Sequence, residues 1–416
     1  MGDGMTPRDQ LLSSFAAAVK AALPDQAVRD AAKTILVPKG RTIVVGGGKA
    51  AASMAKALED CWETDLSGVV VTRYGHAIVQ PRQIVLLEAS HPVPDSASQQ
   101  AGERILKTVS HLSSDDLVIV LLSGGGSALM VAPNGVTLEE KRQINQQLLD
   151  SGAEIGEMNI VRKHLSQLKG GRLALAAAPA RVVSLIVSDV VGDDLSTIAS
   201  GPTVPDPSTI QDAINVLKRF KISSPAALEY LEHTANETPK SNHPSRVQNH
   251  LIVTNLTALQ AAKNVLQEHN IQTQIWSDAI TGEARIAAQL HAQKARTLES
   301  GTAFLSGGET TVTVRGTGRG GRNCEFLLAL ALELNGLPNL YAIACDTDGI
   351  DGVTKAAGAI LTPDSLERAS QLGLNPEAML KNNDAYSFFS ALGDLVVVGP
   401  TGTNVNDFRC LLRTAA

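Results

Sequence analysis

The sequence is poor in aromatic residues and has no excess of basic side chains, and each shortage excludes a class of protein. Its 416 residues include seven Phe, four Tyr and two Trp, which offer no stacking platform for single-stranded nucleic acid. The 42 acidic residues outnumber the 36 basic ones, and the resulting net charge of −6 argues against a broad contact with a phosphate backbone. We therefore expect no nucleic-acid partner.

Cysteines are few, and long apolar runs and a signal segment are absent. The four cysteines form no CxxC pair and no metal-ligand spacing, which argues against a disulfide framework or a structural zinc site: Cys61, Cys324, Cys345 and Cys410. Glycines and a proline interrupt the two most apolar stretches, 117–132 and 173–191, so neither provides the roughly 20 apolar residues of a membrane span. The first ten residues lack the basic-then-apolar order of a secretory signal. We predict a soluble, cytoplasmic protein with no membrane partner.

Short runs rich in Val and Ile alternate with segments of helical period along most of the chain. This alternation is typical of parallel strands joined by crossover helices, and the predicted strands include 42–45, 68–71, 84–87, 117–122 and 182–187. The chain is also longer than one hydrophobic core usually fills. A polar stretch, 233–249, has no apolar period and is the predicted linker.

These features predict an α/β fold with two domains. Residues 1–243 are expected to form a large Rossmann-like N-terminal domain with a mostly parallel sheet. Residues 244–416 are expected to form a smaller α/β domain, with the active site in the cleft between the two.

A first glycine cluster follows the first predicted strand. Gly46, Gly48 and Ala51 formally satisfy the G-x-G-x-x-A pattern of a dinucleotide-binding turn. The acidic residue expected about 20 positions further on is replaced by Arg73, which weakens NAD more than NADP. Lys49, just after the glycines at a helix start, instead favours a site that neutralises a transferring phosphoryl group. The dinucleotide alternative stays open at this point.

A second glycine cluster follows the most apolar predicted strand. Its main-chain N–H groups and two hydroxyls favour the binding of an anion: Ser123, Gly124, Gly125, Gly126 and Ser127. The loop is not a Walker A motif, because G-x-x-x-x-G-K-[ST] occurs nowhere in the chain. It also fails the G-x-S-x-G pattern of a serine hydrolase. We predict that it binds nucleotide phosphates.

Charged residues stand where phosphoryl chemistry would need them. Arg322 follows two glycines at a predicted helix start, where the helix dipole and the guanidinium can act on the same oxygens. Asp189, Asp194 and Asp348 follow predicted strands, and ligands and magnesium collect outside the carboxyl ends of parallel strands. These acids are therefore candidate metal ligands.

Together the motifs resemble those of the glycerate 2-kinase family, in which a large N-terminal domain is combined with a MOFRL-type C-terminal domain. The resemblance extends in order over nearly the whole chain, through the runs 46–50, 91–95, 123–129, 161–164, 169–172, 188–203, 307–314, 320–323, 347–352 and 401–406. Two departures are visible: Cys324 stands where Gln is expected, and Lys355 stands in a stretch that usually has an acid. Members of this family are also labelled hydroxypyruvate reductase, often in the context of tartrate or glyoxylate catabolism.

The resemblance implies that ATP and Mg²⁺ are used to phosphorylate D-glycerate at its 2-hydroxyl, giving 2-phosphoglycerate. Lys49 and Arg322 carry over as the functional cations, and with Gly47 and Gly48 they are the candidates for binding the substrate. NAD(P)H-dependent hydroxypyruvate reduction is the alternative activity. The sequence does not determine the oligomeric state, and a homodimer is one alternative.

The remaining roles concern ATP and the metal. ATP is expected in the interdomain cleft, with its phosphates on the loop from Ser123 to Ser127. The acids expected to supply the Mg²⁺ ligands are Asp189, Asp194, Glu309 and Asp348. Asp189 is also the candidate for orienting or deprotonating the 2-hydroxyl.

Overall fold

The computed structural model describes residues 5–77, 79–241 and 246–415, which form two compact units. One unit runs from Pro24 to Val253, and the other joins the residues up to Leu23 to those from Thr254 onward. The first helix thus belongs with the C-terminal unit, and the N-terminal unit extends past the expected boundary at 243/244. No helix in the described ranges is long and apolar enough to cross a membrane.

The N-terminal unit is built on a sheet of six parallel strands in the order β3-β2-β1-β4-β5-β6. The strands are β1 (Thr42–Gly47), β2 (Leu66–Arg73), β3 (Ile84–Ala89), β4 (Leu117–Leu122), β5 (Arg181–Val187) and β6 (Val247–Val253). β1 and β4 are buried at every residue, as expected for central parallel strands that helices cover on both faces. The predicted α/β fold with a parallel N-terminal sheet is confirmed.

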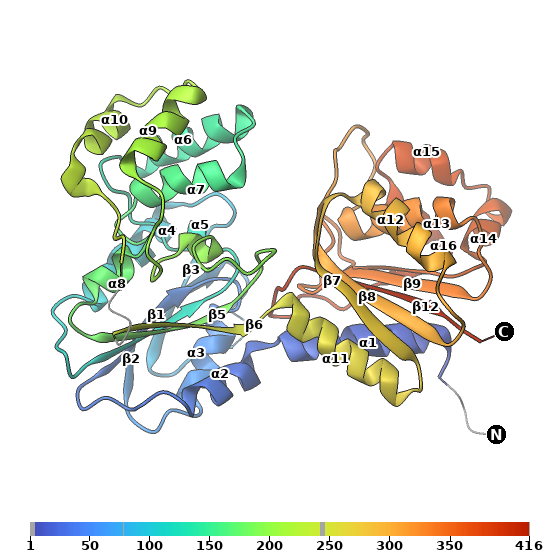
Figure 1. The fold of residues 1–416 in the computed structure, drawn as a ribbon, viewed down its shortest axis with the longest axis horizontal. Coiled ribbons are helices and arrows are strands. Elements are labelled where there is room, and N and C mark those ends of the chain that lie inside the picture. The colour runs from blue at the N-terminus through green and yellow to red at the C-terminus, as the bar shows by residue number, and fades with distance from the viewer. Residues whose placement is uncertain (1–4, 78, 242–245, 416) are drawn as a thin grey trace. The chain divides into compact units, whose positions relative to one another are not determined.

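Helices lie on both faces of this sheet (Figure 1). One face is covered by α2 (Pro24–Ala32) and α3 (Ala51–Glu59), and the other by α4 (Ser96–Thr108), the short α5 (Gly126–Leu129) and α8 (Arg172–Ala176). The strand order reverses between β1 and β4, because the chain first runs outward to β3 and then returns. In a doubly wound sheet, ligands bind outside the carboxyl ends of the strands at such a reversal.

Four helices form a lobe of the same unit, set apart from its sheet (Figure 1). They are α6 (Leu138–Asp150), α7 (Ile155–His164), α9 (Ile210–Arg219) and α10 (Pro225–Glu232), and they share a small apolar core. α6 begins at a capping box, in which the Thr137 side chain accepts from the Glu140 amide and the Glu140 carboxylate accepts from the Thr137 amide.

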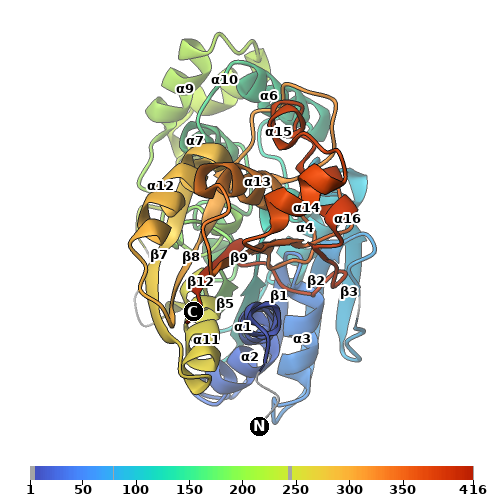
Figure 2. The same cartoon turned by 90° about the vertical axis from the view of Figure 1, so that its right-hand side faces the viewer.

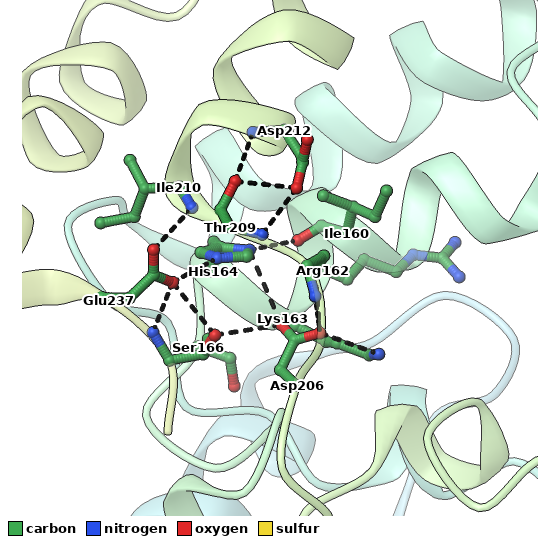
Figure 3. Close-up of polar contacts among 12 residues, drawn as sticks. Ile160, Arg162, Lys163, His164, Ser166, Asp206, Thr209, Ile210, Asp212 and Glu237 are labelled. Carbon is green, nitrogen blue, oxygen red and sulfur yellow. Dashed lines mark hydrogen bonds and ion pairs between the residues drawn. The ribbon is translucent and has the colours of Figure 1, made fainter. Parts of the chain in front are cut away.

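A polar network ties α7 to α9 and to the segment after α10 (Figure 3). The ring of His164, at the end of α7, lies 3.0 Å from the Glu237 carboxylate and 2.8 Å from the Ile160 carbonyl. The Ile210 amide, at the start of α9, donates to the second Glu237 oxygen at 3.0 Å. The described part of the predicted linker therefore packs within the N-terminal unit, while positions 242–245 lie outside the described residues.

The C-terminal unit has a mixed sheet in the order β11-β10-β9-β12-β8-β7. Its strands are β7 (Gln272–Glu283), β8 (Thr302–Thr311), β9 (Leu340–Asp346), β10 (Gly358–Leu361), β11 (Leu395–Val396) and β12 (Asp407–Arg413). β7 and β8 are parallel and the other pairs are antiparallel. The sheet corresponds to the smaller α/β domain predicted at the C-terminal end of the chain.

Helices also cover both faces of the C-terminal sheet (Figures 1 and 2). α1 (Pro7–Ala22) and α11 (Asn255–Glu268) pack together on one face, which explains why the first helix joins this unit. The other face carries α12 (Ala284–Arg296), α13 (Arg322–Leu334), α14 (Ser365–Gln371), α15 (Pro376–Lys381) and α16 (Ala385–Leu392).

Replacing Glu237 with glutamine should remove part of the acid dependence of stability. Burial alone would raise the pKa of Glu237, but hydrogen bonds from the Ile210 amide, Lys240 and the Thr238 amide outweigh burial and lower the pKa to about 2. Because the ordinary pKa is 4.5, this carboxylate stabilises the fold fully above that pH, and the stabilisation is lost as the pH falls towards 2.

Urea midpoints of the wild type and Glu237→Gln should therefore differ at about pH 7, and the difference should shrink below about pH 4.5 and become smallest near pH 2. The exposed Glu232, at the end of α10, provides the control, and Glu232→Gln should leave the midpoint nearly unchanged throughout. A constant difference between wild type and Glu237→Gln over the whole pH range would contradict the role assigned to this carboxylate.

Candidate active site

The two glycine-rich loops after β1 and β4 are locked together at the strand reversal. The Lys49 amide donates to the Gly124 carbonyl at 2.8 Å, and the Ala50 amide donates to the Ser123 hydroxyl at 3.0 Å. Gly48 has φ +145°, and a Cβ there would lie 2.1 Å from Ser123 Oγ, so the loops can approach this closely only with glycine at that position. Ser123 is buried and holds the loops together in this structure; its predicted contact with a nucleotide stays a prediction.

Asp189 lies against the second loop. A Cβ on Gly124 would lie 2.1 Å from Asp189 Oδ2, so the carboxylate occupies the space that a side chain at position 124 would need. Asp189 follows β5, the neighbour of β4 in the sheet. The structure thus brings the predicted acid and the predicted phosphate loop into direct contact.

A cavity of about 300 Å³ opens beside this loop, within the N-terminal unit. Its wall is formed by residues that follow β3, β4 and β5 and by the helical lobe, including His91, Gly125, Ser127, Lys141, Lys169 and Asp189. Gly125 has φ +84° and a Cβ there would lie 3.0 Å from the His91 ring, so this turn also requires glycine. The Ser127 hydroxyl lies 2.7 Å from the Ser200 hydroxyl.

Basic side chains line the cavity at three positions. Lys141 on α6 donates to the Leu165 carbonyl at 2.6 Å, and Lys169 donates to the Ser127 carbonyl. Arg162 on α7 donates from Nε to the Asn145 side chain at 3.2 Å. Arg162 and Lys169 lie in the runs 161–164 and 169–172 of the family resemblance, but neither was a candidate site residue. No sequence pattern marks Lys141 as a site residue, because it lies among the polar residues of an amphipathic helix.

His91 and Lys49 lie close enough to influence each other electrostatically. Burial lowers the pKa of His91 to about 4, and the positive charges of Lys49 and Arg73 add to the effect. The imidazole is therefore neutral near pH 7, where one ring nitrogen can donate a hydrogen bond and the other can accept one. His91 belongs to the cavity wall, although the sequence assigned it no role.

Asp194 is engaged in local structure. Its carboxylate accepts from the Ser196 amide at 2.9 Å and from the Thr197 hydroxyl at 2.7 Å. Burial opposes ionisation, but these hydrogen bonds outweigh it and hold the pKa of Asp194 below its ordinary value. The contacts stabilise a turn after β5, and the metal-binding role of Asp194 stays a prediction.

Arg322, in the C-terminal unit, is held by three carboxylates. It donates from Nε to Asp407 at 2.7 Å, from Nη1 to Glu309 at 2.8 Å and from Nη2 to Asp346 at 2.8 Å. Burial disfavours the charged guanidinium, but Asp407, Asp346 and Glu309 more than offset this effect and raise the pKa of Arg322. Arg322 is the first residue of α13, as the sequence predicted.

The sequence did not identify Asp346 and Asp407 as partners of Arg322. They are direct neighbours in the register of the antiparallel strands β9 and β12. This pairing joins residues about 60 positions apart, so no local sequence pattern predicts it. Their proximity follows from the sheet topology.

Among the described residues, no cluster of three or more His, Cys, Asp or Glu side chains is arranged to hold a metal ion. Glu309 contacts Arg322, and Asp348 accepts from the Ile350 amide at 2.9 Å. Mg²⁺ that is bound together with substrate phosphates needs only one or two carboxylates. Asp189 packs against the loop at Gly124, and its metal-binding role, like those of Asp194, Glu309 and Asp348, stays a prediction.

Two family profiles match the chain. Residues 10–232 match the family described as a domain of unknown function, DUF4147, and residues 302–407 match the MOFRL family. The two profiles cover most of both compact units.

Relatives are similar over nearly the full chain. The D-glycerate 2-kinase of Thermotoga maritima is 42% identical over 94% of this chain and 94% of its own length. The glycerate 2-kinase of Pyrococcus horikoshii is 38% identical over 96% of this chain and 95% of its own length. A protein of Agrobacterium vitis that is provisionally named hydroxypyruvate reductase is 50% identical over 90% of this chain and 88% of its own length.

A solved structure agrees with this relationship. The crystal structure of glycerate kinase from Thermotoga maritima superimposes with a TM-score of 0.91 and 40% sequence identity, covering 98% of this chain and 99% of that one. The resemblance drawn from the sequence motifs is confirmed, and the chain belongs to the glycerate kinase family that combines a DUF4147 domain with a MOFRL domain.

Proposed function

We propose that this protein is a glycerate 2-kinase, which transfers the γ-phosphoryl group of ATP to the 2-hydroxyl of D-glycerate and releases 2-phosphoglycerate and ADP. The observation that carries the proposal is the pair of interlocked glycine loops at the strand reversal, with Lys49, Asp189 and a cavity rich in basic side chains at the same edge of the sheet. The full-length similarity to relatives named glycerate 2-kinase supports the same activity.

Phosphoryl transfer demands positioning and charge neutralisation more than covalent help from the protein. In the proposed mechanism, the loop from Gly124 to Ser127 binds the phosphates, and Lys49 neutralises the charge that develops on the transferring group. Asp189 orients the 2-hydroxyl of glycerate or accepts its proton. Bound Mg²⁺ would neutralise charge on the phosphate oxygens, and holding it is the alternative role of Asp189, because a carboxylate bound to the metal is a poor acceptor for the hydroxyl proton.

Reduction of hydroxypyruvate is the second candidate, because relatives carry that name and Gly46, Gly48 and Ala51 match a dinucleotide turn. In a dinucleotide site, the second glycine lets the pyrophosphate approach the main chain. Here the corresponding space at Gly48 is filled by Ser123 Oγ. Arg73 is the last residue of β2, where an NAD site would have an acid. Both observations favour the kinase.

One assay separates the two activities. Purified protein given ATP, Mg²⁺ and D-glycerate should form a product that enolase converts without added phosphoglycerate mutase, since enolase acts on the 2-phosphate only. The same preparation given NAD(P)H and hydroxypyruvate should oxidise no cofactor above background. Oxidation of NAD(P)H without phosphorylation of D-glycerate would show that the protein is a reductase and not a kinase.

Replacing Lys49 with methionine should lower kcat by about 100-fold to 1,000-fold, because the transferring phosphoryl group loses its positive neighbour. Circular dichroism should show an unchanged fold. Lys56 on α3, which pairs with Asp60, supplies a matched control, and Lys56→Met should keep kcat within about twofold. Turnover at the wild-type level in Lys49→Met would remove the proposed role.

Replacing Arg322 with glutamine should reduce both turnover and stability. The variant leaves Glu309, Asp346 and Asp407 without their shared cation, which should lower the free energy of unfolding by about 3 kcal/mol. Turnover should fall by more than about 100-fold if the guanidinium also contacts the phosphoryl group. Urea titration and the enolase-coupled assay measure the two effects.

The exposed Arg319, on the glycine-rich loop before α13, provides the control for the Arg322 variant. Arg319→Gln should change neither quantity appreciably. Arg322→Gln with normal turnover and reduced stability would leave Arg322 a purely structural residue.

A further inference from the structure

We propose that Lys141, Arg162 and Lys169 form a binding site for the polyphosphate of the nucleotide, in the cavity beside the loop from Gly125 to Ser127. This inference rests on the proposed function for the identity of the ligand. The site itself rests on the placement of three basic side chains around one cavity. The sequence motifs gave no sign of Lys141, and they included Arg162 and Lys169 only within the runs 161–164 and 169–172.

Two of these basic side chains are buried on the cavity wall. Lys141 is 4% exposed and Lys169 is 2% exposed, and both line the cavity together with Arg162. A buried ammonium is costly to desolvate unless an opposite charge or several hydrogen-bond acceptors surround it. Their burial beside open space therefore requires an explanation.

The neighbouring charges make the burial of both lysines less favourable. Burial lowers the pKa of Lys141 to about 7, and the positive charges of Arg162 and Arg172 contribute. Burial also holds the pKa of Lys169 well below its ordinary value, with Lys141 and Arg162 as the contributing charges. Burial is the main cause of both shifts, and the neighbouring charges that add to it are all positive. An anion in the cavity would relieve this repulsion.

A neighbouring lysine shows what a purely structural buried lysine looks like in this protein. Lys163 is also buried, but its ammonium lies 3.3 Å from the carboxylate of Asp206, which is fully buried. Lys141 and Lys169 instead donate to main-chain carbonyls, which partly satisfy the N–H groups without neutralising the charge. Figure 3 shows the Arg162 guanidinium pointing away from the network around His164 and Glu237.

The charges around the cavity indicate which kind of anion it suits. Three basic side chains share the wall with one acid, Asp189, and a neutral His91. This surplus suits a polyanion better than a single carboxylate. Lys169 also donates to the carbonyl of Ser127, so the cations adjoin the loop that is expected to bind phosphates. The cavity volume of about 300 Å³ lies at the lower end of the usual range for ligand sites.

The direct test is equilibrium binding of tripolyphosphate, a probe that contains the polyphosphate without a base or sugar. The wild type should bind tripolyphosphate, and Lys141→Met and Lys169→Met should each raise its dissociation constant at least about tenfold. Arg142, next to Lys141 but on the surface of α6, is the matched control, and Arg142→Met should stay within about twofold. Failure of the wild type to bind, or equal binding by the variants, would overturn the site.

Competition identifies the source of the phosphates. ATP should displace tripolyphosphate from the wild type, whereas D-glycerate at similar concentration should not. Displacement by D-glycerate, or by 2-phosphoglycerate but not ATP, would overturn the assignment to the nucleotide. The thermal midpoint provides a second readout: tripolyphosphate should raise it in the wild type and in Arg142→Met, but much less in Lys141→Met and Lys169→Met.

Failure of this site and failure of the proposed function give different results. If the protein binds ATP through Lys141 and Lys169 but forms no 2-phosphoglycerate, the proposed binding site stands and the proposed kinase activity is wrong. If the wild type forms 2-phosphoglycerate but Lys141→Met keeps wild-type affinity for ATP and tripolyphosphate, the proposed activity stands and the proposed binding site is wrong.

Discussion

The contact between the loops after β1 and β4 is the constraint on which the rest of the candidate site depends. Two main-chain amides, of Lys49 and Ala50, bond to the β4 loop, and Gly48 leaves the space that Ser123 fills. A side chain at position 48 would separate the loops and remove both hydrogen bonds. The site is therefore built first from main-chain geometry, and the functional side chains are positioned by it.

The two compact units solve the problem of burying charge in opposite ways. In the C-terminal unit, Arg322 is surrounded by three carboxylates, so its charge is compensated within the protein. In the N-terminal unit, Lys141 and Lys169 are buried near other cations. A charge that is compensated within the protein needs no further partner, and removing its partners would leave it buried and unpaired. Cations that are left uncompensated beside a cavity favour an anionic ligand, and this difference is why the phosphate site is assigned to the N-terminal unit.

The sequence was sufficient to predict those elements that depend only on residues close together in the chain. The strands around Val45 and Leu121 were predicted from apolar runs. The glycine loops were recognisable because a turn after a parallel strand has few solutions. The packing of α1 on the C-terminal sheet was not predictable, because an amphipathic helix does not specify which sheet its apolar face will contact.

The residues that sequence reasoning missed share one physical property: their role depends on partners that are distant in the chain. Asp346 and Asp407 meet only because β9 and β12 are paired. Lys141 reaches the cavity only because α6 packs beside the end of α7, where its ammonium meets the Leu165 carbonyl. In sequence, Lys141 is indistinguishable from its surface neighbour Arg142. The distinction between a binding residue and a solvated one therefore arises at the level of helix packing, where burial and neighbouring charge first become defined.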